Sequence, residues 1–161
     1  MVNKINSIIS NAIYQNHIRK IAEWEKEREF CRHDTVHFTD VARIAMILNL
    51  QEGYGLEQEM IYAAALLHDI GRWQQYETGE DHALVSARLA PAILNECGFS
   101  EADSGQIVSA IATHRESRVK DDRNLNGLLY RADKLSRPCY FCGQEKNCNW
   151  KDDKKNMVLE I

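Results

Sequence analysis

The sequence predicts an all-α fold, arranged as a single compact helical bundle. Apolar residues recur at intervals of three and four along almost the whole chain, which is the spacing of amphipathic helices. Only two prolines and eight glycines interrupt this pattern, so long helices are permitted nearly everywhere. No alternating apolar and polar segment predicts a β-strand or a hairpin. A length of 161 residues fits one domain with a substantial hydrophobic core.

The N-terminal part of the chain carries two predicted helices. Apolar spacing from Ile5 onward predicts one amphipathic helix over residues 3–28. A second helix should begin near Asp34 or Thr35, because either side chain can cap a helix start. It carries His37 on the same face as its apolar residues. Glycines that follow this helix indicate a loop.

The middle of the chain carries two more helices separated by a polar stretch. A third helix is predicted over about residues 57–69, with Gly71 as its stop signal. Residues 74–81 are polar and are predicted to form a loop. A fourth helix should begin at His82, with Pro91 inside it as a potential kink.

Two further helices complete the predicted domain. The fifth contains His114 in phase with its apolar residues, and residues 115–123 should form a loop after it. The sixth aligns Asp133 with apolar neighbours. We therefore expect a helical domain of residues 1–138, followed by a cysteine-bearing tail of residues 139–161 that packs on it.

Composition narrows the class of protein. Hydrophobic residues make up 44% and charged residues 27% of the chain, which is ordinary for a soluble globular protein. A net charge of −4 gives no general reason to expect nucleic acid or an acidic membrane as a partner. No apolar run is long enough for a membrane span or a signal peptide, so we expect a cytoplasmic protein. Its five cysteines would then be reduced, which favours metal binding or free thiols over disulfides.

Histidine and aspartate side chains recur on the apolar faces of five predicted helices. A buried, unpaired aspartate is costly, so such groups need a partner or a metal ion. Any one of these histidines could be an ordinary hydrogen-bonded core residue, but their joint placement indicates a metal centre. Imidazole and carboxylate ligands suit one or two divalent ions of Fe, Mn, Co, Ni or Zn. The predicted ligands are His37, His68, Asp69, His82, His114 and Asp133.

The motifs around these residues resemble the HD superfamily of metal-dependent phosphohydrolases. The resemblance covers roughly residues 33–137 and implies a helical HD-domain bundle. It is carried by His37 in HFTDVARIA, the doublet His68 and Asp69 in AAALLHDIGR, His114 in IVSAIATHRE and Asp133 in YRADKLSR. With His82 and His114 added, the chain resembles the two-metal subset, which includes HD-GYP phosphodiesterases and bacterial dinucleoside-tetraphosphate hydrolases. The glycine-tyrosine-proline signature is absent, so cyclic-di-GMP hydrolysis is not expected.

The resemblance also implies roles for the ligands. Asp69 would bridge two metal ions, the first held also by His37, His68 and Asp133 and the second also by His82 and His114. Such a centre activates water and offsets phosphoryl charge. The implied reaction is hydrolysis of a phosphate ester or anhydride, in a nucleotide or small phosphorylated metabolite.

Several basic residues near these motifs are candidates for substrate binding. Arg72 follows the doublet after a glycine, so its guanidinium could clamp phosphate oxygens at the mouth of the site and take part in catalysis with His68 and Asp69. The alternative is a solvated arginine. Arg115 and Lys134, each beside a predicted ligand, are further candidates for substrate contact. His33 lies one helical turn before His37 and is expected to support the ligands.

The cysteines form a separate pattern. Cys139, Cys142 and Cys148 cluster in CYFCGQEKNCNW, and Cys31 could supply a fourth ligand. This spacing is typical of a structural zinc site; three reduced thiols on a packed tail and an iron–sulfur cluster are the alternatives. Cys97 is expected to be a core residue.

Two other functions are compatible with the predicted metal ligands. One is a di-iron HD oxygenase that activates O₂, and the other is a non-catalytic metal-binding regulatory module. Fold alone does not separate these from a hydrolase. Phosphate release and O₂ consumption distinguish the two enzymes, and the sequence does not fix the oligomeric state.

Overall fold

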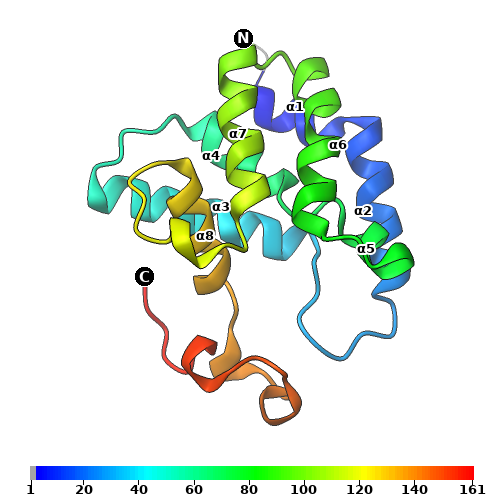
Figure 1. The fold of residues 1–161 in the computed structure, drawn as a ribbon, viewed down its shortest axis with the longest axis vertical. Helices are drawn as coiled ribbons and strands as arrows, with labels where there is room; N and C mark the ends of the chain where they lie inside the picture. The colour runs from blue at the N-terminus through cyan, green and yellow to red at the C-terminus, as the bar shows by residue number, and fades with distance from the viewer. Residues whose placement is uncertain (1–2) are drawn as a thin grey trace.

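The computed structural model describes residues 3–161, and Figure 1 shows that these residues form a bundle of helices. The described residues contain eight α-helices and no β-strand, so the predicted all-α fold is confirmed. The α-helices are α1 (Lys4–Ser10), α2 (Ala12–Trp24), α3 (Thr35–Glu52), α4 (Gln58–Leu67), α5 (Arg72–Thr78), α6 (His82–Glu96), α7 (Glu101–Thr113) and α8 (Leu125–Leu135). Short 3-10 helices are η1 (Ser117–Val119), η2 (Cys139–Phe141), η3 (Glu145–Asn147) and η4 (Asp152–Lys154).

The expected single helix over residues 3–28 is wrong, because the chain breaks at Asn11. The Asn11 side chain accepts hydrogen bonds from the backbone N–H groups of Ile13 (2.9 Å) and Tyr14 (3.0 Å) and so caps α2. Its own backbone N–H donates to the Ile8 carbonyl and ends α1. Asparagine competes well for backbone hydrogen bonds, which favours a cap over a helix interior. Residues 26–34 then form a loop.

Helix α4 is the central element of the bundle. Its residues Ala63, Ala64, Ala65, Leu66 and Leu67 are at most 2% exposed, so its C-terminal half is buried on every side. It contacts α1, α3, α6, α7 and α8. A helix end that is buried all round fixes the position of whatever follows it, and here the doublet of His68 and Asp69 follows directly.

Gly71 allows the chain after the doublet to approach α6 closely. A Cβ atom on Gly71 would lie 2.6 Å from Cγ1 of Val85 and 2.7 Å from the backbone nitrogen of Ser86. The Gly71 N–H donates to Oγ of Ser86 at 2.9 Å. The helix before the doublet ends at Leu67, ahead of the predicted position, and α5 occupies most of the expected loop of residues 74–81.

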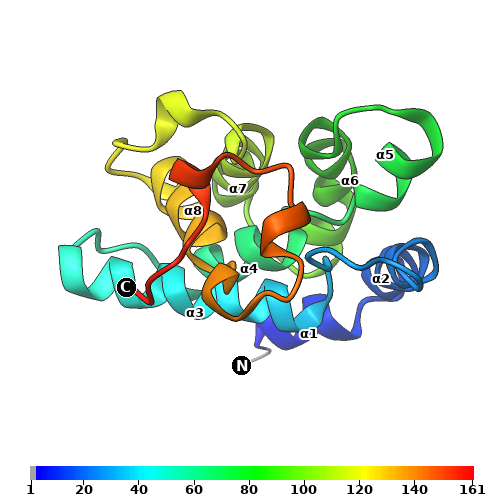
Figure 2. The ribbon, with the colours of Figure 1, turned by 90° about the horizontal axis from the view of Figure 1, so that it is seen from below.

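The tail lies at one end of the bundle. In Figure 1 it extends below the helices, beside the loop that joins α2 to α3, and Figure 2 shows it crossing that end of the molecule. The Asn156 side chain donates to the carbonyls of Lys134 (2.6 Å) and Arg137 (2.9 Å), which fastens the tail to the end of α8. In the described part of the chain, no helix has both the length and the apolar character needed to cross a bilayer.

Candidate metal centre

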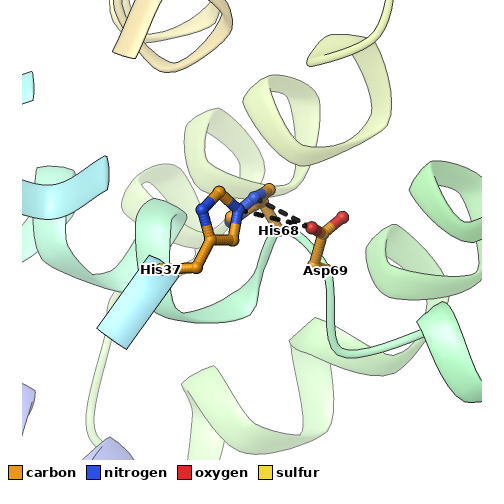
Figure 3. A group of neighbouring side chains, drawn as sticks. All are labelled: His37, His68 and Asp69. Carbon is orange, nitrogen blue, oxygen red and sulfur yellow. Dashed lines mark ion pairs between the residues drawn. The ribbon is translucent and has the colours of Figure 1, made fainter. Parts of the chain in front are cut away.

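The structure brings all six predicted metal ligands together in the interior. They form three overlapping groups, and within each group one ligand atom per residue lies within 4.8 Å of the others. All six residues are buried. The groups are His37, His68 and Asp69, shown in Figure 3; His68, His114 and Asp133; and Asp69, His82 and His114.

Asp69 lies at the centre of this arrangement. Its Oδ2 atom is 3.3 Å from Nε2 of His68 and 3.7 Å from Nε2 of His37, the pairs drawn as dashed lines in Figure 3. Its Oδ1 atom is 3.1 Å from Nε2 of His82 and 3.5 Å from Nε2 of His114. Each carboxylate oxygen therefore faces its own pair of histidines, which is an arrangement suited to bridging two ions.

Asp133 closes the side of the centre formed by His37 and His68. Its Oδ1 atom is 3.4 Å from Nε2 of His37 and 3.5 Å from Nε2 of His68. Its Oδ2 atom accepts a hydrogen bond from Nζ of Lys134 at 2.6 Å. The lysine thus leaves one oxygen of the carboxylate directed at the histidines.

Two of the histidines occupy the position immediately after a helix. His68 follows α4 and its Nδ1 lies 2.6 Å from the Ala65 carbonyl, while His114 follows α7 and its Nδ1 lies 2.7 Å from the Ile111 carbonyl. The last carbonyls of a helix lack intrahelical donors, and here the imidazole Nδ1–H supplies one. This holds Nδ1 as the donor and directs each Nε2 at the centre.

His82 and His37 are oriented by neighbouring polar side chains. Nδ1 of His82 lies 2.6 Å from Oε1 of Gln75, and Nδ1 of His37 lies 3.2 Å from Oγ of Ser136. The Ser136 hydroxyl donates to the Asp133 carbonyl at 2.7 Å, so its oxygen accepts from His37. Both histidines then direct Nε2 at the carboxylates. Sequence reasoning missed Gln75 and Ser136, since their role depends on how the helices pack.

The charges of the centre depend on each other. Burial alone would raise the pKa of Asp69, but nearby His68, His82 and His114 hold it well below its usual value. Burial likewise opposes ionisation of Asp133, yet Lys134 and the adjacent histidines keep its pKa well below the ordinary value. Burial lowers the pKa of His68, but the two carboxylates outweigh it and raise this pKa to about 10. Two ionised carboxylates therefore attract positive charge to the Nε2 atom of His68.

Two buried polar atoms at the centre lack partners, and this bears on whether a metal ion fits there. Nε2 of His68 and Oδ1 of Asp69 have no hydrogen-bond partner among the described residues. Leaving a buried polar atom unpaired costs about 1–3 kcal/mol, which a cation bound between these atoms would offset. Imidazole nitrogens and carboxylate oxygens are ligands for divalent transition ions. The residues therefore fit such an ion.

Arg72 lies at the edge of the centre. Its guanidinium donates to Oε1 of Gln75 and to Nε2 of His33, each at 2.9 Å, and lies 2.7 Å from Nδ1 of His82. Its Nε is buried without a partner among the described residues. Its partners here are neutral groups, so the positive charge of Arg72 remains available for an anion.

His33 and Glu25 form a buried pair behind Arg72. The His33 backbone N–H donates to Oε2 of Glu25 at 2.7 Å, and its ring contacts Oε1 of Glu25. Tyr76 donates to the same carboxylate at 2.7 Å. Burial lowers the pKa of His33 to about 4, so its ring is neutral and accepts from Arg72. Glu25 was missed, because it lies in a stretch of charged residues, EWEKERE, that reads as solvent-exposed.

The remaining predicted site residues lie farther out. Arg115 pairs with Asp81 at 2.5 Å on the surface, and Lys134 pairs with Asp133.

Four cysteines are half-buried and free, and all four line one cavity: Cys31, Cys139, Cys142 and Cys148. Among the described residues no three thiols lie within 4.8 Å of one another, so the geometry gives no support for a single structural zinc ion. Cys97 is buried in the core, as expected.

The sequence of this chain is similar to that of several known proteins. The HD domain family matches residues 34–137. An uncharacterized protein from Clostridium beijerinckii is 41% identical over 158 residues, which cover 98% of this chain and 99% of that protein. Ribonuclease Y from Lawsonia intracellularis is 27% identical over 124 residues, which cover 77% of this chain and 22% of the ribonuclease. This chain therefore corresponds to about a fifth of that enzyme.

A solved structure shares the fold. The crystal structure of a predicted HD superfamily hydrolase from an uncultured Thermotogales bacterium superposes with a TM-score of 0.66 at 22% identity. The superposition covers 92% of this chain and 82% of that one. The matched range, residues 34–137, spans most of the chain and includes all six clustered residues. The chain belongs to the HD domain family.

Proposed function

We propose that this protein is a metal-dependent phosphohydrolase that cleaves a phosphate ester or anhydride in a nucleotide or small phosphorylated metabolite. The observation that carries the proposal is the position of Asp69, whose two carboxylate oxygens face separate pairs of histidines. Its Oδ1 atom and the Nε2 atom of His68 are buried and unpartnered in the described structure, as expected of ligands. Membership of a family that includes hydrolases supports the same class of reaction.

Each residue has a defined task in this proposal. One divalent ion would be held by His37, His68, Asp69 and Asp133. A second would be held by Asp69, His82 and His114. Ions bound there lower the pKa of a water molecule and offset negative charge on the phosphoryl group. Arg72 would bind phosphoryl oxygens through the guanidinium that now donates to neutral partners. Gln75 and Ser136 contact Nδ1 of His82 and of His37 and orient these rings.

The likeness to ribonuclease Y favours including phosphodiesters among the candidate substrates. A ribonuclease cleaves phosphodiester bonds, and 22% of ribonuclease Y matches this chain. Phosphomonoesters present the same kind of phosphoryl oxygens to the metal ions and to Arg72. The substrate screen should therefore contain nucleotides, dinucleoside polyphosphates, phosphomonoesters and short oligoribonucleotides.

The test is phosphate or nucleotide release by protein loaded separately with Mn, Fe, Co, Ni or Zn, measured with and without O₂. Metal-dependent turnover of a phosphate compound under strictly anaerobic conditions is the expected result. Metal-dependent O₂ consumption without hydrolysis would replace the proposal with an oxygenase. Stoichiometric metal binding with neither activity would favour a regulatory module.

A further inference from the structure

The four cysteines that lie outside the metal centre surround a single cavity. Cys31 comes from the loop before α3, and Cys139, Cys142 and Cys148 come from the tail. The cavity has a volume of about 330 Å³. A single buried water needs only about 10–15 Å³ of such volume, so the space is large enough for a group of many atoms.

Among the described residues, the sulfurs are not gathered closely enough for a single ion. Zn–S bonds are about 2.3 Å long, so sulfurs on one tetrahedral zinc ion lie about 3.8 Å apart. In the described chain no three thiols meet even a 4.8 Å limit, although the histidine and aspartate groups do. A cluster of several iron and sulfide ions instead holds its thiolates farther apart, one on each of four corners.

We propose that Cys31, Cys139, Cys142 and Cys148 bind an iron–sulfur cluster of the [4Fe–4S] type. Four thiols around one cavity are the number that such a cluster requires. Each thiol would lose a proton and form one bond to iron, with iron and sulfide supplied during cluster assembly. This inference goes beyond the proposed hydrolase function and does not depend on it.

The charges around the cavity suit a cluster held by four thiolates. Arg28, Arg137 and Lys155 line the same cavity, together with Glu145, which pairs with Lys155. The basic residues there outnumber the acidic one. The Trp150 backbone N–H donates to Sγ of Cys148 at 3.5 Å. Hydrogen bonds to cysteine sulfur and nearby positive charge stabilise the negative charge of an iron–sulfur cluster.

The backbone holds the tail cysteines in place without a long helix. The N–H of Cys142 donates to the Cys139 carbonyl at 3.1 Å, and the N–H of Cys148 donates to the Glu145 carbonyl at 3.3 Å. Lys155 donates to the carbonyl and to Oε1 of Glu145, each at 2.9 Å, which closes this loop. These contacts fix the loop on which all three tail thiols are carried.

Cys31 is positioned from the other side of the cavity. Nε of Arg28 donates to the Cys31 carbonyl at 2.8 Å, and Nη1 of Arg137 donates to the adjacent Arg32 carbonyl at 3.2 Å. Burial raises the pKa of the Cys31 thiol, and the three tail cysteines raise it further, against the effect of Arg137. The pKa of Cys31 thus responds to all three tail cysteines, although they lie more than 100 residues away in the sequence.

The experiment begins with the unmodified 161-residue chain, produced and purified without O₂ in iron-supplemented medium. Acid-labile sulfide is the decisive measurement, because the histidine and aspartate centre can bind iron but holds no sulfide. We expect about four sulfides per chain, a broad visible absorbance, and an electron paramagnetic resonance signal after reduction. This measurement needs no variant, so a folding defect cannot affect it.

Single serine substitutions then assign the ligands. Each of four variants should lower labile sulfide and visible absorbance about tenfold or more: Cys31→Ser, Cys139→Ser, Cys142→Ser and Cys148→Ser. Cys97→Ala is the matched control, because Cys97 lies in the core and does not line the cavity, and it should retain the sulfide. Asp69→Asn should also retain the sulfide, which separates this site from the metal centre.

Three results would overturn the inference. The first is unmodified protein with zinc bound and no labile sulfide, which would indicate a single-ion thiolate site. The second is four thiols that react freely with an alkylating reagent in anaerobically purified protein, together with no sulfide. The third is sulfide that persists in the four serine variants, which would place the cluster elsewhere.

Discussion

Nε2 of His82 lies 3.1 Å from Oδ1 of Asp69, yet this oxygen has no hydrogen-bond partner among the described residues. On its other side, Nδ1 of His82 is engaged by Oε1 of Gln75 at 2.6 Å and by Nη1 of Arg72 at 2.7 Å. The Asp69 oxygen is therefore a buried carboxylate atom without a donor. Such an atom is unfavourable unless a cation lies beside it.

Removing the charge of Asp69 should therefore release metal. In Asp69→Asn the shape is kept but the bridging carboxylate is lost, so metal affinity and turnover should fall by more than about 100-fold. Metal content by elemental analysis and phosphate release measure the two effects. Asp40→Asn is the control, since Asp40 is half-exposed on α3, and it should behave like the parent. Unchanged metal content in Asp69→Asn would contradict the assignment.

Two ions should be held by separate histidine pairs. His82→Ala and His114→Ala should each reduce bound metal from about two ions per chain to about one, because each removes a ligand from the same side of Asp69. His17→Gln is the control, since His17 is also buried but accepts a hydrogen bond from Trp73 and lies outside the ligand groups. If both alanine variants keep the full metal content, the centre holds one ion.

Arg72 should matter for the phosphoryl group and not for metal retention. Arg72→Ala should reduce turnover of the best phosphate substrate by about 2–4 kcal/mol in transition-state stabilisation, with metal content preserved. Arg72→Lys should recover part of this loss, because it keeps the charge but not the planar fork. Arg43→Ala changes an arginine that is 68% exposed, and serves as control. Parent-like turnover by Arg72→Ala would show that its guanidinium does not bind substrate.

Gly71 should be required for the packing of the turn after the doublet. Gly71→Ala places a methyl group within 2.7 Å of Ser86 backbone, so we expect a loss of about 1–3 kcal/mol in the free energy of unfolding. Gly105→Ala is the matched control, because nothing lies within 4 Å of its added Cβ in helix α7. That control should be stabilised by up to about 1 kcal/mol. Urea unfolding of both variants gives the comparison, and equal stabilities would refute the packing argument.

His33 should make the fold sensitive to mild acid. Burial lowers its pKa to about 4 in the folded protein, from an ordinary value of 6.5, so between these values the unfolded chain binds a proton that the folded chain does not. The free energy of unfolding should therefore fall as the pH drops from 6.5 to 4, with about 2–3 kcal/mol due to His33. Denaturant titrations of metal-free protein over this range, with His33→Gln beside the parent, measure that share. Parallel curves for the two proteins would contradict it.

Much of the site could be predicted because its ligands follow strong local patterns. Asp34 caps α3 as expected, with its Oδ1 accepting from the His37 N–H at 3.0 Å, and this sets the phase of His37 on that helix. The apolar run before His68 predicts a buried helix, and the structure has α4 there. The spacing of apolar residues is thus sufficient to locate the helices that carry the ligands.

Other features depend on contacts that no local pattern records. His68 and His114 lie one residue beyond their helices, where Nδ1 can reach a terminal carbonyl, although periodicity placed them within helices. Asn11 divides the predicted N-terminal helix because its side chain caps the next one. Glu25 is 3% exposed only because His33 and Tyr76 fold over it. Such partners come from distant segments, so sequence spacing carries no sign of them.

The distribution of the ligands along the chain has a consequence for folding. His37 lies near the start of α3 and Asp133 near the end of α8, yet they meet at 3.4 Å. An unfolded or half-formed chain offers only the adjacent pair of His68 and Asp69, which is too few ligands to retain an ion. Contacts between such distant segments form late, since closing long loops is slow. Metal uptake followed during refolding should therefore coincide with the last kinetic phase. It would report when the tertiary structure is complete.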